Sequence, residues 1–368
     1  MLKRASWGLT IWMGSLCASS LPGQPLAQGQ VPSGYNQSAG YTVDHGFGLH
    51  LDASYLYWCF RESMLKIGTI TAPASTEGSQ FFYSGNGQIV FQSPSYQSGF
   101  QVGMGFAMKG MDDWNFQAEY TWYKNHSSQN TELQNGSFLA FSKDIYTADD
   151  RLDVGVLLAR SVFSKVALDF DSLDTLLERP FYLGKKLIVN VGCGLKALWI
   201  HQQLSASGSG LSFLSPASTA PEPIGLAGEF QSTTQQKSWA LGPKFQFNTS
   251  WLMGYGLKLL GNAAASVLYT RYTTWQTTLS GPISTSSTAS VTNSVSDPFN
   301  TLRAVTETSL GLGWGSYFCN DHFHIDFSAS YDFNVYWNQN MVGLLPNHND
   351  SPGNMYLYGL HLLARFDF

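Results

Sequence analysis

Charged residues are scarce in this sequence of 368 residues: Asp, Glu, Lys and Arg together make up 12%, about half the share in an ordinary soluble protein. Aromatic residues reach 14%, and there are 36 glycines. Few charges and many aromatic rings indicate a surface that does not face water everywhere. The formal net charge of −5 also argues against a general nucleic-acid binder, which would carry a basic face.

Long apolar runs are absent as well. The nearest candidate, 256–269, is interrupted by Lys258 and Asn262. A membrane-spanning helix needs about 20 predominantly apolar residues. The chain is therefore not expected to cross a membrane by helices.

The amino terminus has the pattern of an export signal. Lys3 and Arg4 precede a short apolar run at 7–18, and the small, polar residues that follow offer Ala27 as a cleavage position. We therefore predict a signal peptide over 1–27 and a flexible lead-in over 28–45. A single domain is expected over 46–368.

Alternation with a period of two residues is the pattern that is present, and it is clearest between 178 and 201. Successive side chains of a strand point to opposite faces. After a turn at 183–186, one face carries Val189, Val191, Cys193, Leu195, Ala197 and Trp199, and the other carries Asn190, Gly192, Gly194 and Lys196. A soluble sandwich would alternate too, so the hairpin alone decides nothing.

Repetition of the pattern along the chain is decisive. Alternating segments cover 47–58, 100–108, 114–122, 165–182, 187–201, 239–247, 257–272, 303–314, 323–337 and 356–368. The segment 151–162 fits a short helix about as well as a strand, and we expect a structured loop there. Long polar stretches, predicted to be loops, lie at 62–95, 124–150, 202–237 and 273–300.

These segments have the length of membrane strands, roughly 9–11 residues or somewhat more. Short turns alternate with long loops, and aromatic residues gather at strand ends. Hydrocarbon cannot satisfy an open sheet edge, so the sheet must close. We predict an all-β, transmembrane, antiparallel up-and-down barrel of about ten strands, within a range of 8–14. The long loops should be extracellular, and the short turns and both termini periplasmic.

Several segments carry a family resemblance. They are Glu178-Arg-Pro-Phe-Tyr-Leu-Gly-Lys-Lys-Leu, Gly194-Leu-Lys-Ala-Leu-Trp-Ile, Gly242-Pro-Lys with Trp251-Leu, Leu260-Gly-Asn-Ala-Ala-Ala-Ser-Val-Leu-Tyr, Tyr336-Trp-Asn-Gln-Asn-Met and Gly359-Leu-His-Leu-Leu-Ala-Arg-Phe-Asp-Phe. With these residues the chain resembles the pore-forming, major-outer-membrane-protein-like family of Legionella and chlamydia-related bacteria. The match runs from about Phe47 to the end and is firmest after Leu176. The resemblance implies an outer-membrane barrel thought to form aqueous pores, and it supplies no catalytic residues.

Charged residues on the non-lipid faces are the main candidates for function. By alternation they are His50, Asp52, Glu119, Asp169, Lys196, Lys244, Arg303, Glu307, Asp326, Asp332 and Arg365. Rings of such charges tune ion selectivity in pores. A structural salt-bridge network that fills a narrow barrel explains them equally well. Both signs are present, so weak selectivity at most is expected.

Other chemistry has little support. His322, His324 and Asp326 could serve a zinc site, but their place beside a polar lumen or turn explains them more simply. The pair Gly192 and Gly194 lacks the third glycine of a dinucleotide fingerprint. No spacing of Ser, His and an acid singles out a hydrolase. We therefore expect neither an enzyme nor a metal or other cofactor.

Three cysteines follow the signal region: Cys59, Cys193 and Cys319. Their expected positions are too far apart for internal pairing. One hypothesis, implied by the chlamydial type of outer-membrane protein, is that Cys319, and Cys59 with it, cross-links to envelope partners. Unreactive free thiols are the other. On the apolar face, Phe366 and the terminal Phe368 suit an outer-membrane assembly signal.

The sequence thus predicts a protein of the outer membrane of a Gram-negative bacterium, with membrane lipid and the barrel-assembly machinery as partners and no nucleic acid. Cysteine-linked envelope proteins and further copies of the chain are the other partners considered. The predicted function is a pore for passive diffusion of small hydrophilic solutes or ions. The alternative is a structural or adhesive surface protein with a plugged barrel, in which the long loops carry the function.

Overall fold

The fold is known from a computed structural model of the chain. The expected signal peptide and most of the lead-in lie outside the residues that it describes. It describes residues 36–41, 43, 48–63, 65–71, 88–108, 114–132, 138–141, 156–214, 224–225, 229–280, 282–284, 287–290, 293–296, 298–341 and 352–368.

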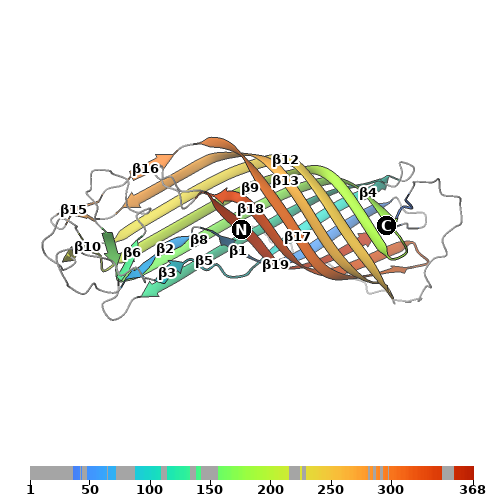
Figure 1. Ribbon diagram of the computed structural model, residues 1–368, viewed down its shortest axis with the longest axis horizontal. Helices are drawn as coiled ribbons and strands as arrows, with labels where there is room; N and C mark the ends of the chain where they lie inside the picture. Colours follow the sequence, from blue (N-terminus) through green and yellow to red (C-terminus); the bar gives the residue numbers. More distant parts are fainter. Residues whose placement is uncertain are drawn as a thin grey trace, which may run out of the picture.

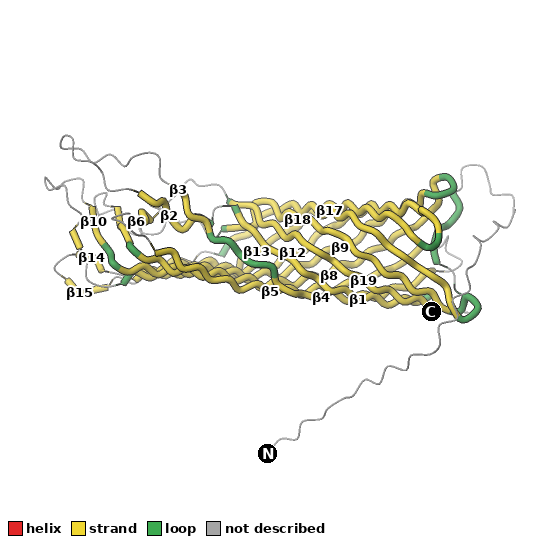
Figure 2. The backbone as a smooth tube through the Cα atoms, turned by 90° about the horizontal axis from the view of Figure 1, so that it is seen from below, coloured by secondary structure: helices red, strands yellow, loops and turns green. Residues whose placement is uncertain are grey.

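Ten long strands form a closed barrel (Figures 1 and 2). Each pairs antiparallel with the next in the chain, and the last pairs with the first. The prediction of an up-and-down barrel of about ten strands is confirmed. The strands are β1 (Leu49–Glu62), β4 (Gln97–Met108), β5 (Trp114–Glu132), β8 (Ser161–Leu183), β9 (Leu187–Ser209), β12 (Phe230–Gly254), β13 (Leu257–Ser280), β17 (Phe299–Phe318), β18 (Phe323–Asn340) and β19 (Gly353–Asp367).

Parts of the expected loops are strands as well. Six segments form a second sheet in the order β11-β10-β7-β6-β2-β3, β14 pairs with β15, and β16 pairs with β13. Their bounds are β2 (Lys66–Thr71), β3 (Gln88–Phe91), β6 (Phe138–Phe141), β7 (Val156–Ala159), β10 (Ser212–Leu214), β11 (Ile224–Gly225), β14 (Pro282–Ser284), β15 (Ser287–Ser290) and β16 (Asn293–Ser296). The segment expected as a structured loop thus contains β7 and the start of β8.

The barrel strands are also longer than their alternation predicts. Strand β5 was expected to end at Trp122 and reaches Glu132, while β9 was expected to end at His201 and reaches Ser209. Beyond those points both faces of the strands are rich in Ser, Thr, Gln and Asn, so the alternation of apolar and polar residues disappears. Pairing between backbones continues, because backbone hydrogen bonds do not depend on that alternation.

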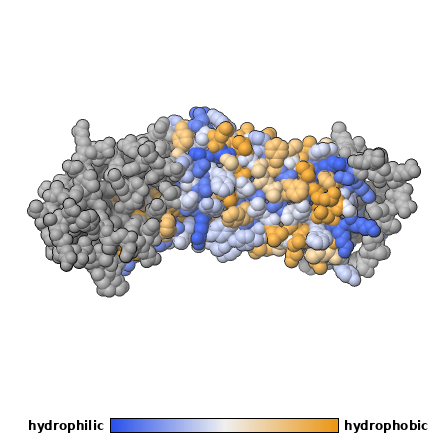
Figure 3. Space-filling model, in the orientation of Figure 1, coloured by the Kyte–Doolittle hydropathy of each residue, from blue (hydrophilic) through white to orange (hydrophobic). Residues whose placement is uncertain are grey.

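The outer surface of the barrel is apolar over a broad zone (Figure 3). On β9 the outward side chains of Val191, Leu195 and Trp199 are 47%, 54% and 48% exposed. The ten steps along the strand from Val189 to Trp199 span about 33 Å. At a strand tilt of about 40° this is about 25 Å of height, which matches the apolar band of outer-membrane barrels. The described residues contain no helix long and apolar enough to cross a membrane.

Candidate functional site

The lumen of the barrel contains a polar chamber. The cavity has a volume of about 390 Å³ and is lined from all ten barrel strands. It lies toward the end of the barrel that carries the short turns and the carboxy terminus, which we call the turn end (Figures 1 and 2). The opposite end, with the second sheet, is called the loop end.

Four charged side chains form a closed ring of ion pairs in the chamber, which we call the quartet. Lys196 Nζ lies 2.9 Å from Asp174 Oδ2 and 2.7 Å from Glu307 Oε1. Lys244 Nζ lies 3.1 Å from Asp174 Oδ1 and 2.7 Å from Glu307 Oε2. The four come from β8, β9, β12 and β17, so the quartet ties together nearly half the wall. Two positive and two negative groups alternate, and their charges cancel.

Glycines make room for the two lysines. In the pairing of β9 with β12, Lys196 faces Gly242 and Lys244 faces Gly194. A Cβ atom on Gly194 would lie 1.8 Å from the Thr175 carbonyl oxygen, and one on Gly242 would lie 2.0 Å from the Val267 carbonyl oxygen. These positions therefore accept only glycine, and each lysine lies beside a neighbour without a side chain.

A second group of polar side chains covers the wall formed by β1, β4, β5 and β8. Gln117 Nε2 donates to Asp52 Oδ2 (3.2 Å) and to Glu119 Oε1 (2.5 Å). Asn115 Nδ2 donates to Glu178 Oε1 (3.1 Å). These carboxylates are held by amide donors, whereas those of the quartet are held by lysines.

A third group lies at the mouth of the turn end. Lys258 pairs with Asp326. Arg365 Nη2 lies 2.7 Å from Asp367 Oδ1, and His324 Nδ1 lies 2.8 Å from Asp367 Oδ2. Strands β13, β18 and β19 supply these residues, on the far side of the barrel from β8.

The N-terminal segment (residues 36–43, of which 42 is not described) crosses this mouth. On one side it pairs with the end of β8: Ala39 N donates to Pro180 O (3.1 Å), and Tyr182 N donates to Gln37 O (2.9 Å). On the other side Tyr41 stacks on His324, with ring centroids 4.0 Å apart. Because β8 and β18 are five strands apart in either direction around the ring, the segment spans the opening.

Tyr41 has polar contacts on that far side too. Its hydroxyl donates to Asp326 Oδ2 (3.1 Å) and accepts from Lys258 Nζ (2.7 Å). The Arg365 guanidinium lies 5.3 Å from the centre of its ring, within the range of a cation–π interaction. One side chain thus anchors the N-terminal segment across the mouth.

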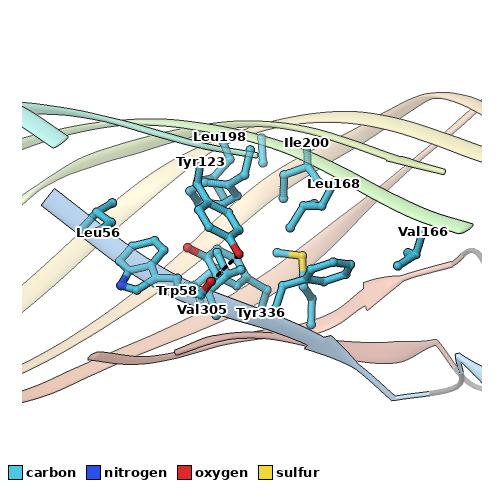
Figure 4. Close-up of a cluster of buried hydrophobic side chains, with 14 of the residues drawn as sticks. Leu56, Trp58, Tyr123, Val166, Leu168, Leu198, Ile200, Val305 and Tyr336 are labelled. Carbon is cyan, nitrogen blue, oxygen red and sulfur yellow. Dashed lines mark hydrogen bonds between the residues drawn. The ribbon is translucent and has the colours of Figure 1, made fainter. Parts of the chain in front are cut away.

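An apolar layer closes the chamber toward the loop end (Figure 4). Every barrel strand except β4 contributes at least one buried apolar side chain to it. Phe170 of β8 meets Tyr336 of β18 from the opposite wall, with ring centroids 5.5 Å apart. Tyr123 donates a hydrogen bond to the Trp58 carbonyl oxygen (2.7 Å). These buried side chains come from opposite walls and pack together across the lumen.

A glutamine cap, made of Gln202, Gln236 and Gln339, lies beyond the apolar layer. Gln236 Nε2 donates to Gln202 Oε1 (2.6 Å) and to Gln339 O (3.0 Å). Asn338 has a φ of 55°, a left-handed conformation at which the end of β18 departs from regular strand geometry. The N-terminal segment, the apolar layer and this cap thus cross the lumen at three levels.

Most of the residues predicted to face the lumen lie together in the chamber. Those that line it are His50, Asp52, Glu119, Lys196, Lys244, Glu307, Asp326, Asp332 and Arg365. Arg303 lies instead beside the glutamine cap, where its Nε donates to the Tyr272 hydroxyl (3.2 Å).

The prediction for Asp169 is wrong. Its side chain is on the outer face of β8, 3.5 Å from Lys124 Nζ, while Leu168 and Phe170 point into the apolar layer. The alternation of β8 was identified correctly, but its apolar face was assigned to lipid. For the same reason Asp174 and Glu178 were not predicted to face the lumen, although they are on the inward face of β8 and line the chamber.

The three cysteines in the described part of the chain are free. Cys59 is 3% exposed, and its thiol donates to the Pro94 carbonyl oxygen (3.3 Å). Burial removes it as a candidate for cross-linking in this conformation. Cys319 is exposed in the turn between β17 and β18, so the cross-linking hypothesis now rests on it alone.

The remaining sequence candidates do not gather into a site. His322 is exposed, whereas His324 and Asp326 face the chamber mouth with partners of their own. In the part of the chain that the structure describes, no three His, Cys, Asp or Glu side chains are grouped as a metal ion would require. Phe366 packs on the outer face against Phe318, Phe323 and Phe368.

Replacing Tyr41 by alanine is expected to open the turn end without unfolding the barrel. A loss of about 1.4 kcal/mol of docking free energy corresponds to about a tenfold larger undocked population. The measurement is the rate at which a small charged thiol reagent labels S330C in the chamber, in a C59S/C193S/C319S background. Y255A removes a fully exposed tyrosine at the same end and should not change that rate. Equal rates in Y41A and Y255A would contradict a closing role for Tyr41.

Three solved structures match most of the chain at low sequence identity. The P. putida toluene transporter TodX is 9% identical, with 87% of this chain and 90% of that chain covered and a TM-score of 0.22. A Pseudomonas aeruginosa FadL homologue is 7% identical, with 90% and 98% covered and a TM-score of 0.26. OmpTdeltaL8, a loop deletion mutant of the Vibrio cholerae outer membrane protein OmpT, is 10% identical, with 85% and 99% covered and a TM-score of 0.17.

Sequence comparison identifies the family. No curated protein is significantly similar to the chain. The family model described as "Legionella pneumophila major outer membrane protein precursor" matches residues 43–368, which include all ten barrel strands. The chain therefore belongs to the Legionella major outer membrane protein family and is a β-barrel of the bacterial outer membrane.

Proposed function

We propose that the protein is a gated outer-membrane channel for small hydrophilic solutes, closed in the conformation described here. The observation that carries this proposal is the charged chamber of about 390 Å³ inside the barrel. The turn end would be periplasmic and the loop end extracellular. Solutes would diffuse through the lumen without a chemical step.

The composition of the chamber supports a role in transport. Buried ion pairs are often less stabilising than well-packed apolar side chains of similar volume. A barrel that served only as a scaffold would gain from an apolar filling, whereas the chamber is lined by many charged and polar side chains. A charged lining instead favours water and polar solutes.

Polar atoms that face the cavity support the same proposal. Among the described residues, His50 Nε2, Asp52 Oδ1 and Asn115 Oδ1 have no protein hydrogen-bond partner, and all three residues line the chamber. Buried polar groups normally bind a partner or ordered water. The cavity is large enough to hold several water molecules.

A plugged barrel that serves as a surface scaffold is the alternative. The apolar layer and the glutamine cap favour it, because together they block the lumen in this conformation. The two functions differ in whether the layer ever opens.

Single-channel recording of the refolded protein in a planar bilayer tests the proposal. We expect rare discrete steps that grow with salt concentration, from protein whose folding is verified by its heat-dependent gel migration. A complete lack of steps, both in the wild type and in the layer variant described in the Discussion, would support the plugged barrel.

A further inference from the structure

Outside the lumen, a basic belt follows the apolar zone at the loop end. It consists of Lys124 on β5, Lys165 on β8, Lys237 on β12 and Arg271 on β13. All four side chains point outward and are exposed. Hydrophilic residues border the apolar band on its loop side in Figure 3.

The belt lies beside and beyond a row of outward tryptophans. Strand register links Trp122, Trp199 and Trp239 with Arg271, and this row is inclined to the membrane plane because the strands are tilted. Two residues farther toward the loop end, Lys124, His201 and Lys237 form the next outward row, and Lys165 lies four residues beyond it, opposite Ser205. Tryptophan concentrates at the boundary between hydrocarbon and headgroups. The belt therefore begins at the tryptophan row and continues on its loop side, where outer-leaflet headgroups would lie.

The belt carries excess positive charge. Two carboxylates lie within it: Asp169, 3.5 Å from Lys124 Nζ, and Asp171, which accepts a hydrogen bond from the Tyr120 hydroxyl (2.5 Å). Within the described part of the chain, Lys165, Lys237 and Arg271 have no carboxylate within ion-pair distance. On the described strands of the other half of the barrel, Arg61 is the one outward cation toward the loop end, among Tyr57, Tyr358 and Trp337. Most of the outward positive charge on the described strands is thus on one side.

The wall around and beyond Lys165 is polar and continuous. Strands β8, β9 and β12 continue toward the loop end as paired sheet, and outward positions there include Gln203, Ser205 and Thr233. Thr233 Oγ1 and Gln203 Nε2 both donate to Ser205 Oγ (3.3 Å each). Such amide and hydroxyl groups can exchange hydrogen bonds with sugar hydroxyls. Cations and neutral hydrogen-bonding groups thus lie side by side on the loop side of the tryptophans.

We propose that the basic belt binds the phosphorylated glycolipid of the outer leaflet. Its acyl chains would lie on the apolar zone, its phosphates on the four cations and its sugars along the polar wall. Lysine and arginine form strong charge-assisted hydrogen bonds with phosphate, and clusters of them beside a membrane surface mark recognition of anionic lipid. The sugar-compatible wall favours a glycolipid over a simple anionic phospholipid. This proposal does not depend on whether the lumen conducts.

The test uses the refolded full-length barrel in a neutral detergent. Purified bis-phosphorylated lipid A is titrated against the wild type and against K124Q/K165Q/K237Q/R271Q, with the thermal transition of heat-modifiable migration as readout. K185Q/K186Q, in the exposed turn between β8 and β9, is the matched control. We expect the fourfold variant to need about ten times more lipid A for the same stabilisation and the control to match the wild type. The wild type should bind lipid A more tightly at low salt, and the fourfold variant should lose this salt dependence.

Three results would overturn the proposal. Equal titration of the wild type and the fourfold variant would show that the belt does not bind the lipid. Equal stabilisation by dephosphorylated lipid A would show that acyl contacts suffice, and equal stabilisation by phosphatidylglycerol would show attraction to any anionic lipid. If the fourfold variant fails to fold, the single reversal K165E, at a fully outward position, takes its place and should weaken binding in the same direction.

Discussion

The variant F170A/Y336A is expected to conduct at least about ten times more current than the wild-type barrel in a planar bilayer. Phe170 and Tyr336 come from opposite walls and meet in the centre of the apolar layer. Hydrophobic constrictions in pores block ions by excluding water, so removing both rings should let water connect the chamber with the loop end. The measurement is the conductance of single steps and the fraction of time spent open.

The matched control for that variant is F163A/Y331A. Phe163 and Tyr331 are aromatic residues on the same two strands, but they point outward and are 48% and 51% exposed. Their removal should leave conductance unchanged. Each truncation in the layer also costs stability, about 3–5 kcal/mol for a buried aromatic ring, so folded protein must be verified by its gel migration. A folded F170A/Y336A barrel that stays silent would show that the layer is not the gate.

The second large effect concerns stability. Asp174→Asn should lower the free energy of unfolding by about 3–5 kcal/mol, because it leaves two buried lysines with a single carboxylate, Glu307. The measurement is a urea unfolding titration in lipid or detergent. Asp171→Asn, three residues earlier on the same strand but outward, should change stability by less than about 0.5 kcal/mol. Equal midpoints for the two variants would contradict a stabilising role for the quartet.

For the stability of the barrel, the balance of charge within the quartet should matter more than the number of its ion pairs. The double variant D174N/K244M keeps one lysine with one carboxylate, Lys196 with Glu307, and restores neutrality. We expect it to be more stable than D174N alone, although it has lost one more charged group. Such non-additivity is typical of residues in one network.

Much of the fold could be predicted because alternation is a local property. The strand number and order follow from the ten alternating segments, and β9, which follows the turn at Gly184, shows the predicted faces. The face assignment failed on β8, where Leu168 and Phe170 point inward. Alternation divides a strand into two faces, but only the packed barrel decides which face meets lipid. An apolar layer inside the lumen makes both faces of that strand partly apolar.

The contacts across the lumen could not be predicted from the sequence. Lys196 and Glu307 are far apart in the chain, and their pairing depends on the closure and width of the barrel. Tyr41 lies in a lead-in rich in Gly, Ser and Gln that has no periodic pattern, so it was expected to be flexible. The extensions of β5 and β9 were missed because Ser, Thr and Gln on both faces resemble a loop.

The position of Tyr41 also imposes an order on how the molecule is built. The groups that hold this side chain belong to β13, β18 and β19, which are synthesised after most of the wall. The N-terminal segment is synthesised early, but it can therefore dock fully only after β19 is in place. Protection of the amino terminus from protease would then report completed assembly, and its exposure would mark barrels whose seam between β1 and β19 has not yet closed.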